Sequence, residues 1–497
     1  MDDADGCGGP AVLGAGESTG HVKAFLVRAT NPCSLRWRHL PSRQTGRTGP
    51  LLATGGRKLA TDLTTTQEDA VTQHIAPPVD TIGGPHLTVS DAELDAFVAR
   101  NFAEVDFDGK RVVLVVPDGT RSCPLPLLLR TVHRHLIDRV ASLTTVIALG
   151  THSYMEPDEI DAWFGVEAGS TLADTYPGMT VVNHEFLDHD KVVTLGTLTA
   201  DEISVMTDGM VAEDVVVEMN RYVAEADINL VIGPVFPHEV VGISGGNKYF
   251  IPGCSTHDAI DLSHWVGALI GLETMIGTPG ITPVRAIIDA GSAMIPGLRL
   301  ALCLVVQSGS GEIESVSFGT SEESWAAAAD VASQTHVVYV EEPFKKVIAM
   351  MPTRYDDIWT AAKGCYKMQP AMADGGEVII YAPHVTEVSE QHPEIYDIGY
   401  HCIEYFTKQW EKFSHLPKGV LAHSTHVRGT GTYDPDTATE HNRIKVTLCT
   451  QIPEEVCASV NLGHLALEDA DFDAWNADPD VFVQENAGEV LYRLKTD

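Results

Sequence analysis

Three segments of the chain carry polar side chains that suit acid–base catalysis, and each follows a run of aliphatic or β-branched residues. They are Asp118 and Arg121 after the run 111–116, His152 after 144–149, and His238 after 228–232. In open α/β sheets, ligands bind beyond the carboxyl ends of parallel strands, so we expect these side chains to meet in one crevice. A histidine can take or give a proton near neutral pH, and an arginine can hold a carboxylate through two hydrogen bonds.

A glycine-rich segment with a lysine follows the third of these runs. Residues 244–253 read Ser-Gly-Gly-Asn-Lys-Tyr-Phe-Ile-Pro-Gly, and paired glycines before a lysine suggest close approach of the backbone to a phosphate. The spacing does not fit a Walker A loop, because Lys248 is followed by Tyr249 and not by Ser or Thr. Lys248 is instead a candidate covalent anchor, since a desolvated lysine is a nucleophile.

Histidines beyond the lysine are candidate metal ligands. His264 lies sixteen residues after the lysine, with His257 between them, and imidazole suits nickel, copper, zinc and iron. Neither an HExxH motif nor a closely spaced Cys/His set accompanies His264, so a single histidine ligand makes sense only if a cofactor supplies the others. A further pair, His423 and His426, follows a predicted strand at 419–422, where it would line the same crevice.

Strands and helices alternate around these residues. The predicted strands are 111–116, 144–149, 228–232 and 299–306, and the predicted helices are 94–102, with Ser90 as its cap, and 125–140. A second unit begins near residue 320 with a helix at 321–333 and strands at 337–340, 347–350, 377–382 and 419–422. This order predicts two α/β domains, 81–320 and 321–497, with a catalytic crevice between them.

The first 80 residues differ from the rest. Residues 20–61 contain eight basic residues and no acidic one, with many Gly, Pro, Ser and Thr and no hydrophobic periodicity. We expect residues 1–80 to form a disordered N-terminal extension without a part in the chemistry.

Charge and cysteine content exclude several classes of protein. With 33 Lys and Arg against 69 Asp and Glu, the net charge of −36 disfavours nucleic acid and anionic lipid as partners. The apolar runs are far shorter than the roughly 18–20 residues that a membrane span needs. Nine scattered cysteines without a C-x-x-C pair form neither a disulfide framework nor a zinc ribbon, and favour a reducing, cytoplasmic compartment.

The order of these motifs resembles that of the nickel-pincer lactate racemase family. The matching motifs are Asp-x-Thr-Arg, Gly-Thr-His, Pro-His, Ser-Gly-Gly-x-Lys-x-x-x-Pro-Gly and a downstream His. The ten residues from His238 to Lys248 and the sixteen from Lys248 to His264 also agree with the family pattern. The resemblance covers about residues 82–470.

This resemblance implies a cofactor, a nickel-pincer nucleotide (pyridinium-3-thioamide-5-thiocarboxylic acid mononucleotide) that holds nickel. Lys248 would be joined to one arm of the cofactor as a thioamide, and His264 would complete the coordination of nickel. Asp118 and Thr120 match the loop that binds the cofactor. Separate biosynthetic enzymes would have to supply the nucleotide.

The resemblance also implies a small 2-hydroxy acid as substrate. His152 and His238 would be the acid and base, and Arg121 and Lys363 would bind the substrate carboxylate. The remaining substrate-binding positions are Trp359, Thr360 and Trp410. Because lactate-acting members carry a Tyr-Gln pair where this chain has Trp359-Thr360, we expect racemisation or epimerisation of a 2-hydroxy acid other than lactate.

Two other functions remain open from the residues alone. A hydrolase or lyase could use a plain divalent metal bound by His238, His257 and His264, without any adduct on the lysine. A non-catalytic protein could bind a hydroxy acid through Arg121 and Lys363. The absence of a G-x-G-x-x-G fingerprint disfavours a nicotinamide-dependent dehydrogenase.

Overall fold

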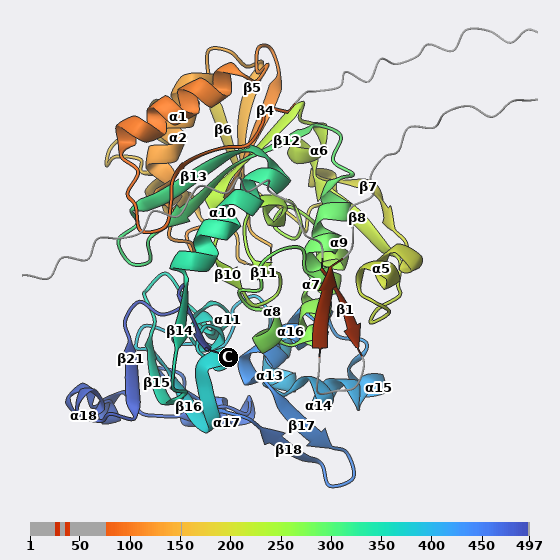
Figure 1. Cartoon of the computed structure of the whole chain (residues 1–497), viewed down its shortest axis with the longest axis vertical. Helices are drawn as coiled ribbons and strands as arrows, with labels where there is room; N and C mark the ends of the chain where they lie inside the picture. The colour runs from red at the N-terminus through yellow and green to blue at the C-terminus, as the bar shows by residue number, and fades with distance from the viewer. Residues whose placement is uncertain (1–24, 30–34, 40–75, 151, 496–497) are drawn as a thin grey trace, which may run out of the picture.

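The computed structural model describes residues 25–29, 35–39, 76–150 and 152–495. Strands β1 (Phe25–Ala29) and β2 (Leu35–His39) pair antiparallel. The rest of the predicted N-terminal extension, up to residue 75, lies outside the described residues. From residue 76 onward, the chain builds two lobes, each around its own main sheet (Figure 1).

A seven-stranded sheet forms the centre of the first lobe. Its spatial order is β3 (Asp80–Gly83), β13 (Ile313–Thr320), β12 (Leu298–Val306), β9 (Ile228–Pro234), β4 (Arg111–Pro117), β5 (Ser142–Ala148) and β6 (Met179–Asn183). The five strands from β12 to β6 are parallel, and β13 pairs antiparallel with β12 and β3. The strands expected from the aliphatic runs are confirmed, because strands buried on both faces read as continuous apolar segments.

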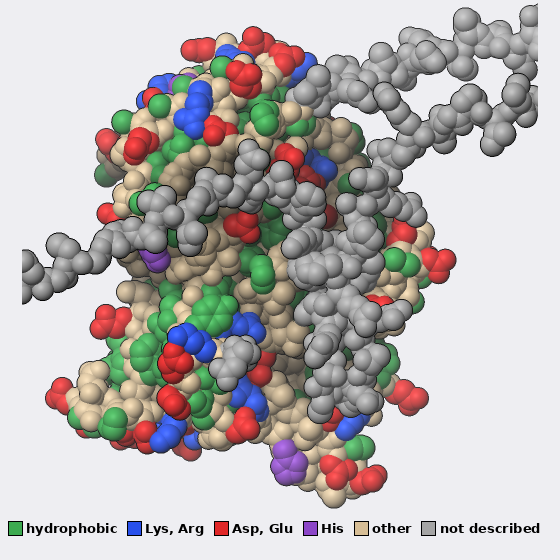
Figure 2. Space-filling model, in the orientation of Figure 1, with side chains coloured by type: hydrophobic (Ala, Val, Ile, Leu, Met, Phe, Trp, Pro, Cys, Tyr) green, Lys and Arg blue, Asp and Glu red, His purple; other side chains and the backbone are tan. Residues whose placement is uncertain are grey.

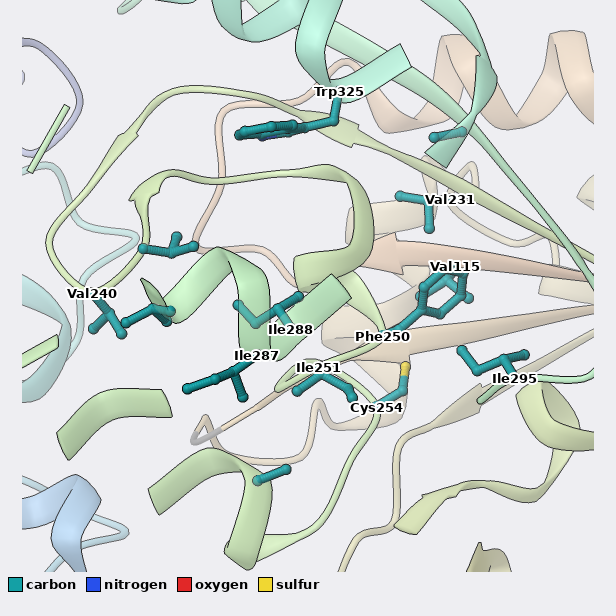
Figure 3. Close-up of a cluster of buried hydrophobic side chains, with 14 of the residues drawn as sticks. Val115, Val231, Val240, Phe250, Ile251, Cys254, Ile287, Ile288, Ile295 and Trp325 are labelled. Carbon is teal, nitrogen blue, oxygen red and sulfur yellow. The ribbon is translucent and has the colours of Figure 1, made fainter. Parts of the chain in front are cut away.

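Helices cover both faces of this sheet. Alternate residues of β4 enter two cores: Val112, Leu114 and Val116 pack with helices α1 (Asp91–Ala103) and α2 (Leu125–Leu136). Val113 and Val115 pack with α7 (His257–Ile270), α9 (Pro283–Ser292) and α10 (Ser321–Thr335). Figure 3 shows this second core, where Val115 and Val231 of the sheet lie near Phe250. The predicted cap is confirmed, since Ser90 and Glu93 form a reciprocal capping box on α1.

The second lobe is built on a five-stranded parallel sheet. Its spatial order is β20 (Gly463–His464), β19 (Lys445–Thr450), β16 (Met372–Ala382), β15 (Phe344–Met350) and β21 (Val481–Gln484). Strands β14 (Val337–Val340) and β22 (Leu491–Leu494) form a separate parallel pair. Helices α11 (Ile358–Ala361), α12 (Lys363–Tyr366) and α16 (Lys418–Arg428) matter most for the site described below.

The remaining elements are short. The helices are α3 (Pro157–Phe164), α4 (Leu172–Thr175), α5 (Ala200–Met206), α6 (Arg221–Glu225), α8 (Leu272–Met275), α13 (Glu394–Ile398), α14 (Ile403–Thr407), α15 (Trp410–Phe413), α17 (Glu454–Ser459) and α18 (Phe472–Ala477). The strands are β7 (Val192–Leu198), β8 (Val215–Asn220), β10 (Pro237–His238), β11 (Gly242–Ile243), β17 (Gly431–Asp434) and β18 (Thr439–Asn442). The 3₁₀ turns are η1 (His189–Lys191), η2 (Gly246–Tyr249), η3 (Gln369–Ala371) and η4 (Leu467–Asp469).

One predicted element is wrong, because residues 419–422 lie in helix α16 and not in a strand. The apolar run is short, and such a run cannot be told from a buried helix by periodicity. Helix α16 is buried along most of its length, so it shows no polar face that would reveal the helical period.

The two lobes meet through α7 and α16, which lie against each other (Figure 1). Across this junction, Lys418 forms an ion pair with Glu213, and the N–H of Gly419 donates to Asp261 Oδ1 at 2.9 Å. Helix α10 packs against β12 and β13 of the first lobe, and the domain boundary at residues 320 and 321 stays a prediction.

Acidic side chains are scattered over the visible face of both lobes (Figure 2), as the net charge requires. In the described part of the chain, none of the helices is both long and apolar enough to cross a membrane.

Candidate active site

A cavity lies where the carboxyl ends of β4, β5 and β9 face α7, α12 and α16. It encloses about 920 Å³ of empty space, its opening to solvent included. Eight of the eleven site residues predicted from the sequence line it: Asp118, Arg121, His152, His238, Lys248, His264, Trp359 and Lys363. The three strand ends therefore converge on one crevice, as expected.

Three predicted site residues are not among the described residues that line this cavity. The hydroxyl of Thr120 donates to Asp118 Oδ1 at 2.6 Å, and that of Thr360 donates to Asp357 Oδ1 at 2.9 Å, so both stabilise neighbouring turns. Trp410 stacks on Trp265 with ring centroids 5.3 Å apart, in a separate hydrophobic cluster. The structure thus places Trp410 away from the pocket that the resemblance implied.

His152 is held by Asp118. Its Nδ1 donates to Asp118 Oδ2, while Asp118 Oδ1 accepts from the N–H and hydroxyl of Thr120. Burial would raise the pKa of Asp118, but His152 and the Arg121 guanidinium outweigh it and hold that pKa well below its usual range. Burial lowers the pKa of His152 despite the nearby carboxylate. His152 is therefore neutral near pH 7, and its Nε2 is a proton acceptor.

His238 has the opposite tautomer. Its Nδ1 accepts the backbone N–H of Val240 at 3.1 Å, so the neutral ring carries its proton on Nε2. That nitrogen lies 3.6 Å from Oε1 of Glu239. Burial and the charges of Lys248 and Lys367 lower the pKa of His238 well below its usual value. One histidine of the cavity thus offers an acceptor and the other a donor.

Lys248 belongs to the turn η2 and lines the cavity. Burial and the charge of Arg121 lower its pKa to about 7, so much of the amine is neutral and nucleophilic at neutral pH.

The two glycines before Lys248 are explained by packing within the protein. Their φ angles are +89° at Gly245 and +57° at Gly246. A Cβ would lie 2.5 Å from Val235 Cγ2 at the first position and 2.7 Å from Trp325 Cβ at the second. A phosphate, which the sequence pattern suggested, is not needed to account for them.

His264 presents one free ring nitrogen. Its Nδ1 lies 2.7 Å from the carbonyl oxygen of Ile260, one turn earlier on α7, and therefore donates to it. This bond leaves the Nε2 lone pair available, as in most metal-binding histidines. Burial lowers the pKa of His264 to about 4, so the ring is neutral, as a metal ligand must be.

The alternative three-histidine metal site is not assembled. His257 is exposed at the start of α7 and is absent from the cavity lining, so it does not join His238 and His264. Among the described residues, no three His, Cys, Asp or Glu side chains gather in a way that could hold a metal ion. Among the described side chains, His264 is thus not part of a group of three metal-ligating residues.

The second lobe supplies an aromatic stack and a cation. The ring of Trp359 lies between those of His392 and His423, with centroid distances of 3.8 Å on both sides. Asp357 caps α11 by accepting the N–H of Thr360 and so orients this segment. Burial and the charge of Arg121 lower the pKa of Lys363 to about 8.

The structure adds residues that the sequence did not assign to the site, since Glu239, Tyr249 and Tyr366 line the cavity. His423 and His426, which were expected at the same crevice, line it as well. The two histidines are three residues apart, which places them on one face of a helix. That spacing would have favoured a shared role if the segment had been recognised as helical. No pattern in the sequence marks Glu239 as facing inward.

Known proteins resemble this chain along most of its length. The family model for the lactate racemase N-terminal domain matches residues 88–273. The lactate racemase of Thermoanaerobacterium thermosaccharolyticum is 25% identical over 279 residues, which make up 55% of this chain and 60% of that protein. The match thus spans less than two thirds of that relative.

Two solved structures share the fold. A crystal structure of a Thermotoga maritima protein has a TM-score of 0.76 and 31% identity, covering 83% of this chain and 100% of that one. The lactate racemase apoprotein from T. thermosaccharolyticum has a TM-score of 0.62 and 20% identity, covering 87% and 97%. The family model and the curated relative agree with the order of motifs, and residues 88–273 of the chain belong to the lactate racemase N-terminal domain family.

Proposed function

We propose that the protein is a racemase or epimerase of a 2-hydroxy acid that works with a lysine-tethered nickel-pincer nucleotide. The observation that carries this proposal is the meeting of His152, His238, Lys248 and His264 in one cavity. A protein that merely bound hydroxy acids would need the cations of the cavity but not this set.

The substrate carboxylate would be held by Arg121 and Lys363, which both line the cavity. The position of Arg121 is fixed in part by its neighbour, because the guanidinium donates a hydrogen bond to the Thr120 hydroxyl at 2.6 Å. A planar guanidinium and a buried ammonium together fix the orientation of a small anion. They thereby set which atom of the substrate faces the histidines.

The two histidines would move the hydroxyl proton. Nε2 of His152 takes this proton, and Asp118 stabilises the imidazolium that forms. His238 presents its Nε2–H to the substrate oxygen. For His238 to act as a base at Nε2, its own proton must shift to Nδ1, so the contact with the Val240 N–H must open. Two such groups are needed because inversion at the α-carbon involves both faces of the substrate.

Lys248 and His264 would hold the cofactor, one through its amine and the other through Nε2. When bound, the nickel nucleotide supplies a reversible acceptor for the hydride of the α-carbon. Trp359 and His423 of the second lobe line the same cavity, so the substrate would bind between the two lobes. Because Trp359 and Thr360 stand where lactate-acting members carry a Tyr-Gln pair, we propose a substrate other than lactate.

The test is the intact mass and nickel content of the full-length protein from cells that express the cofactor-synthesis enzymes. We expect a mass excess of a modified nucleotide on the Lys248 peptide, together with bound nickel. The Lys248→Ala variant, prepared in the same way, should lack the adduct. Unmodified Lys248 in the wild-type protein under these conditions would contradict the proposal.

A further inference from the structure

One wall of the cavity carries two hydrogen-bond acceptors that the proposed reaction does not use. They are the side chains of Glu239, next to His238, and His426, on the inner face of α16. Each affects the pKa of the other, so the two lie near one another. Tyr366 of α12 and His423 of α16 line the same cavity.

His426, which lines the cavity, has a ring nitrogen without a hydrogen-bond partner among the described residues. The side chain is buried, at 3% exposure, and its Nε2 has no hydrogen-bond partner in the described structure. Its other nitrogen bonds to the backbone of Gly267, a contact that raises the pKa of His426 and so joins a ring N–H to a carbonyl. Burial nevertheless lowers that pKa to about 4, which leaves the ring neutral. Nε2 therefore carries a lone pair and can only accept a hydrogen bond.

Glu239 is a buried, ionised carboxylate in the same wall. Burial would raise its pKa, but Lys367 and Lys363 outweigh this and lower it. The ammonium of Lys367 donates to the carbonyl oxygen of Pro237 at 2.5 Å and acts on Glu239 through its charge. In the described part of the chain, the ion-pair contact of Glu239 is with His238, whose Nε2 lies 3.6 Å from Glu239 Oε1. Because Glu239 lines the cavity, its carboxylate can accept hydrogen bonds from a ligand bound there.

From these two acceptors we infer a subsite for hydroxyl groups on the substrate's side chain. The substrate class is then a polyhydroxy monocarboxylic acid, and this inference rests on the proposed function. Two side-chain hydroxyls can donate one hydrogen bond to each acceptor, whereas an alkyl chain donates to neither. A second carboxylate would meet the charge of Glu239 and the lone pair of His426, so hydroxy dicarboxylic acids are disfavoured.

The test compares four-carbon 2-hydroxy acids that differ in the groups on their side chain: none, two hydroxyls, or a second carboxylate. The probes are 2-hydroxybutanoate, 2,3,4-trihydroxybutanoate and malate, titrated calorimetrically into the full-length protein with and without its cofactor. We expect the trihydroxy acid to bind about tenfold more tightly than 2-hydroxybutanoate, and malate to bind more weakly than the trihydroxy acid. Equal affinities, tighter binding of malate, or no binding of any probe to the loaded protein would overturn the inference.

Variants assign the preference to the two residues. In His426→Leu, the affinity for the trihydroxy acid should fall toward that for 2-hydroxybutanoate. His426→Gln should restore part of the difference, because an amide oxygen also accepts a hydrogen bond. Glu239→Gln, which keeps the shape of the side chain, should reduce the same difference. His336→Leu is the control, since His336 is equally buried but lies outside the cavity lining; it should keep the preference. A preference unchanged in both His426→Leu and Glu239→Gln would contradict the subsite.

Turnover separates this inference from the proposed function. If the loaded protein prefers the trihydroxy acid but leaves its C2 configuration unchanged, the proposed function is wrong and the subsite stands. If it inverts 2-hydroxybutanoate as efficiently as the trihydroxy acid, the subsite is wrong and the proposed function stands. Chiral chromatography of the products decides between these results.

Discussion

The carboxylate of Asp118 accepts the Nδ1–H of His152 at the end of the cavity that β4 and β5 form. Its second oxygen is occupied by Thr120, so the carboxylate cannot turn away from the ring. This pair sets the tautomer of His152 and leaves Nε2 free to take a proton. It is a relationship between two loops, each following a different strand.

Asp118→Asn should lower kcat by about 10²–10⁴-fold, because an amide cannot stabilise the imidazolium of His152. The acid limb of the pH–rate profile should also move to lower pH, since the Asp118 charge raises the pKa of His152. Asp95→Asn is the matched control: Asp95 accepts from His135 Nε2 at 2.8 Å on the surface. A profile in Asp118→Asn identical to that of the wild type would show that the pair has no part in proton transfer.

Binding of the acid should weaken above about pH 8. The pKa of Lys363 is lowered from 10.5 to about 8, so its charge is present below that pH and lost above it. We expect kcat/KM of the loaded protein to fall by up to about tenfold per pH unit beyond pH 8. In Lys363→Arg the decline should move to higher pH, because a guanidinium stays charged. A decline at the same pH in both proteins would assign it to another group.

The same lysine affects stability with the opposite trend. Between about pH 8 and 10.5, the unfolded chain keeps the proton of Lys363 and the folded protein has lost it. The unfolded state then binds more protons, so this residue makes the free energy of unfolding rise with pH in that window. Denaturant titrations at several pH values give the free energy of unfolding as a function of pH. Between pH 8 and 10.5 this free energy should rise more steeply with pH in the wild type than in Lys363→Met, and equal pH dependence would contradict the lowered pKa of Lys363.

His264→Ala should abolish nickel binding while Lys248 remains the attachment point for the nucleotide. Nickel content, measured by plasma mass spectrometry on protein from cofactor-producing cells, should fall to background. His257→Ala serves as the control, because His257 is exposed seven residues earlier on the same helix. Retention of nickel in His264→Ala would remove this histidine from the set of ligands.

Trp359→Ala should destabilise the second lobe by about 3–5 kcal/mol, the usual cost of deleting a buried tryptophan. The ring is buried and stacks on two histidines, so its loss leaves a cavity beside the site. Trp475→Ala, in the partly exposed helix α18, should cost clearly less. Urea unfolding followed by circular dichroism measures both. An equal loss of unfolding free energy in both variants would show that the Trp359 stack does not contribute to stability.

Much of the site was predictable because it depends on local pattern. Buried parallel strands such as β4 and β9 need continuous aliphatic runs, and their carboxyl ends lie on one edge of the sheet by geometry. The polar residues that follow these runs, among them Arg121 and His238, therefore had to meet. Lys248 and His264 could be added from the order and spacing of the motifs.

The roles of Glu239, His423 and His426 depended on tertiary structure. The segment around the two histidines has no polar face, and its helical form became visible only once α16 was packed between the lobes. Trp410 was expected in the substrate pocket from its sequence position, but in the folded chain it stacks on Trp265 and is not among the residues that line the cavity. The tautomers of His152 and His238 were likewise decided by Asp118 and the Val240 backbone, because a ring's proton follows its hydrogen-bond partners, and these come from the folded chain.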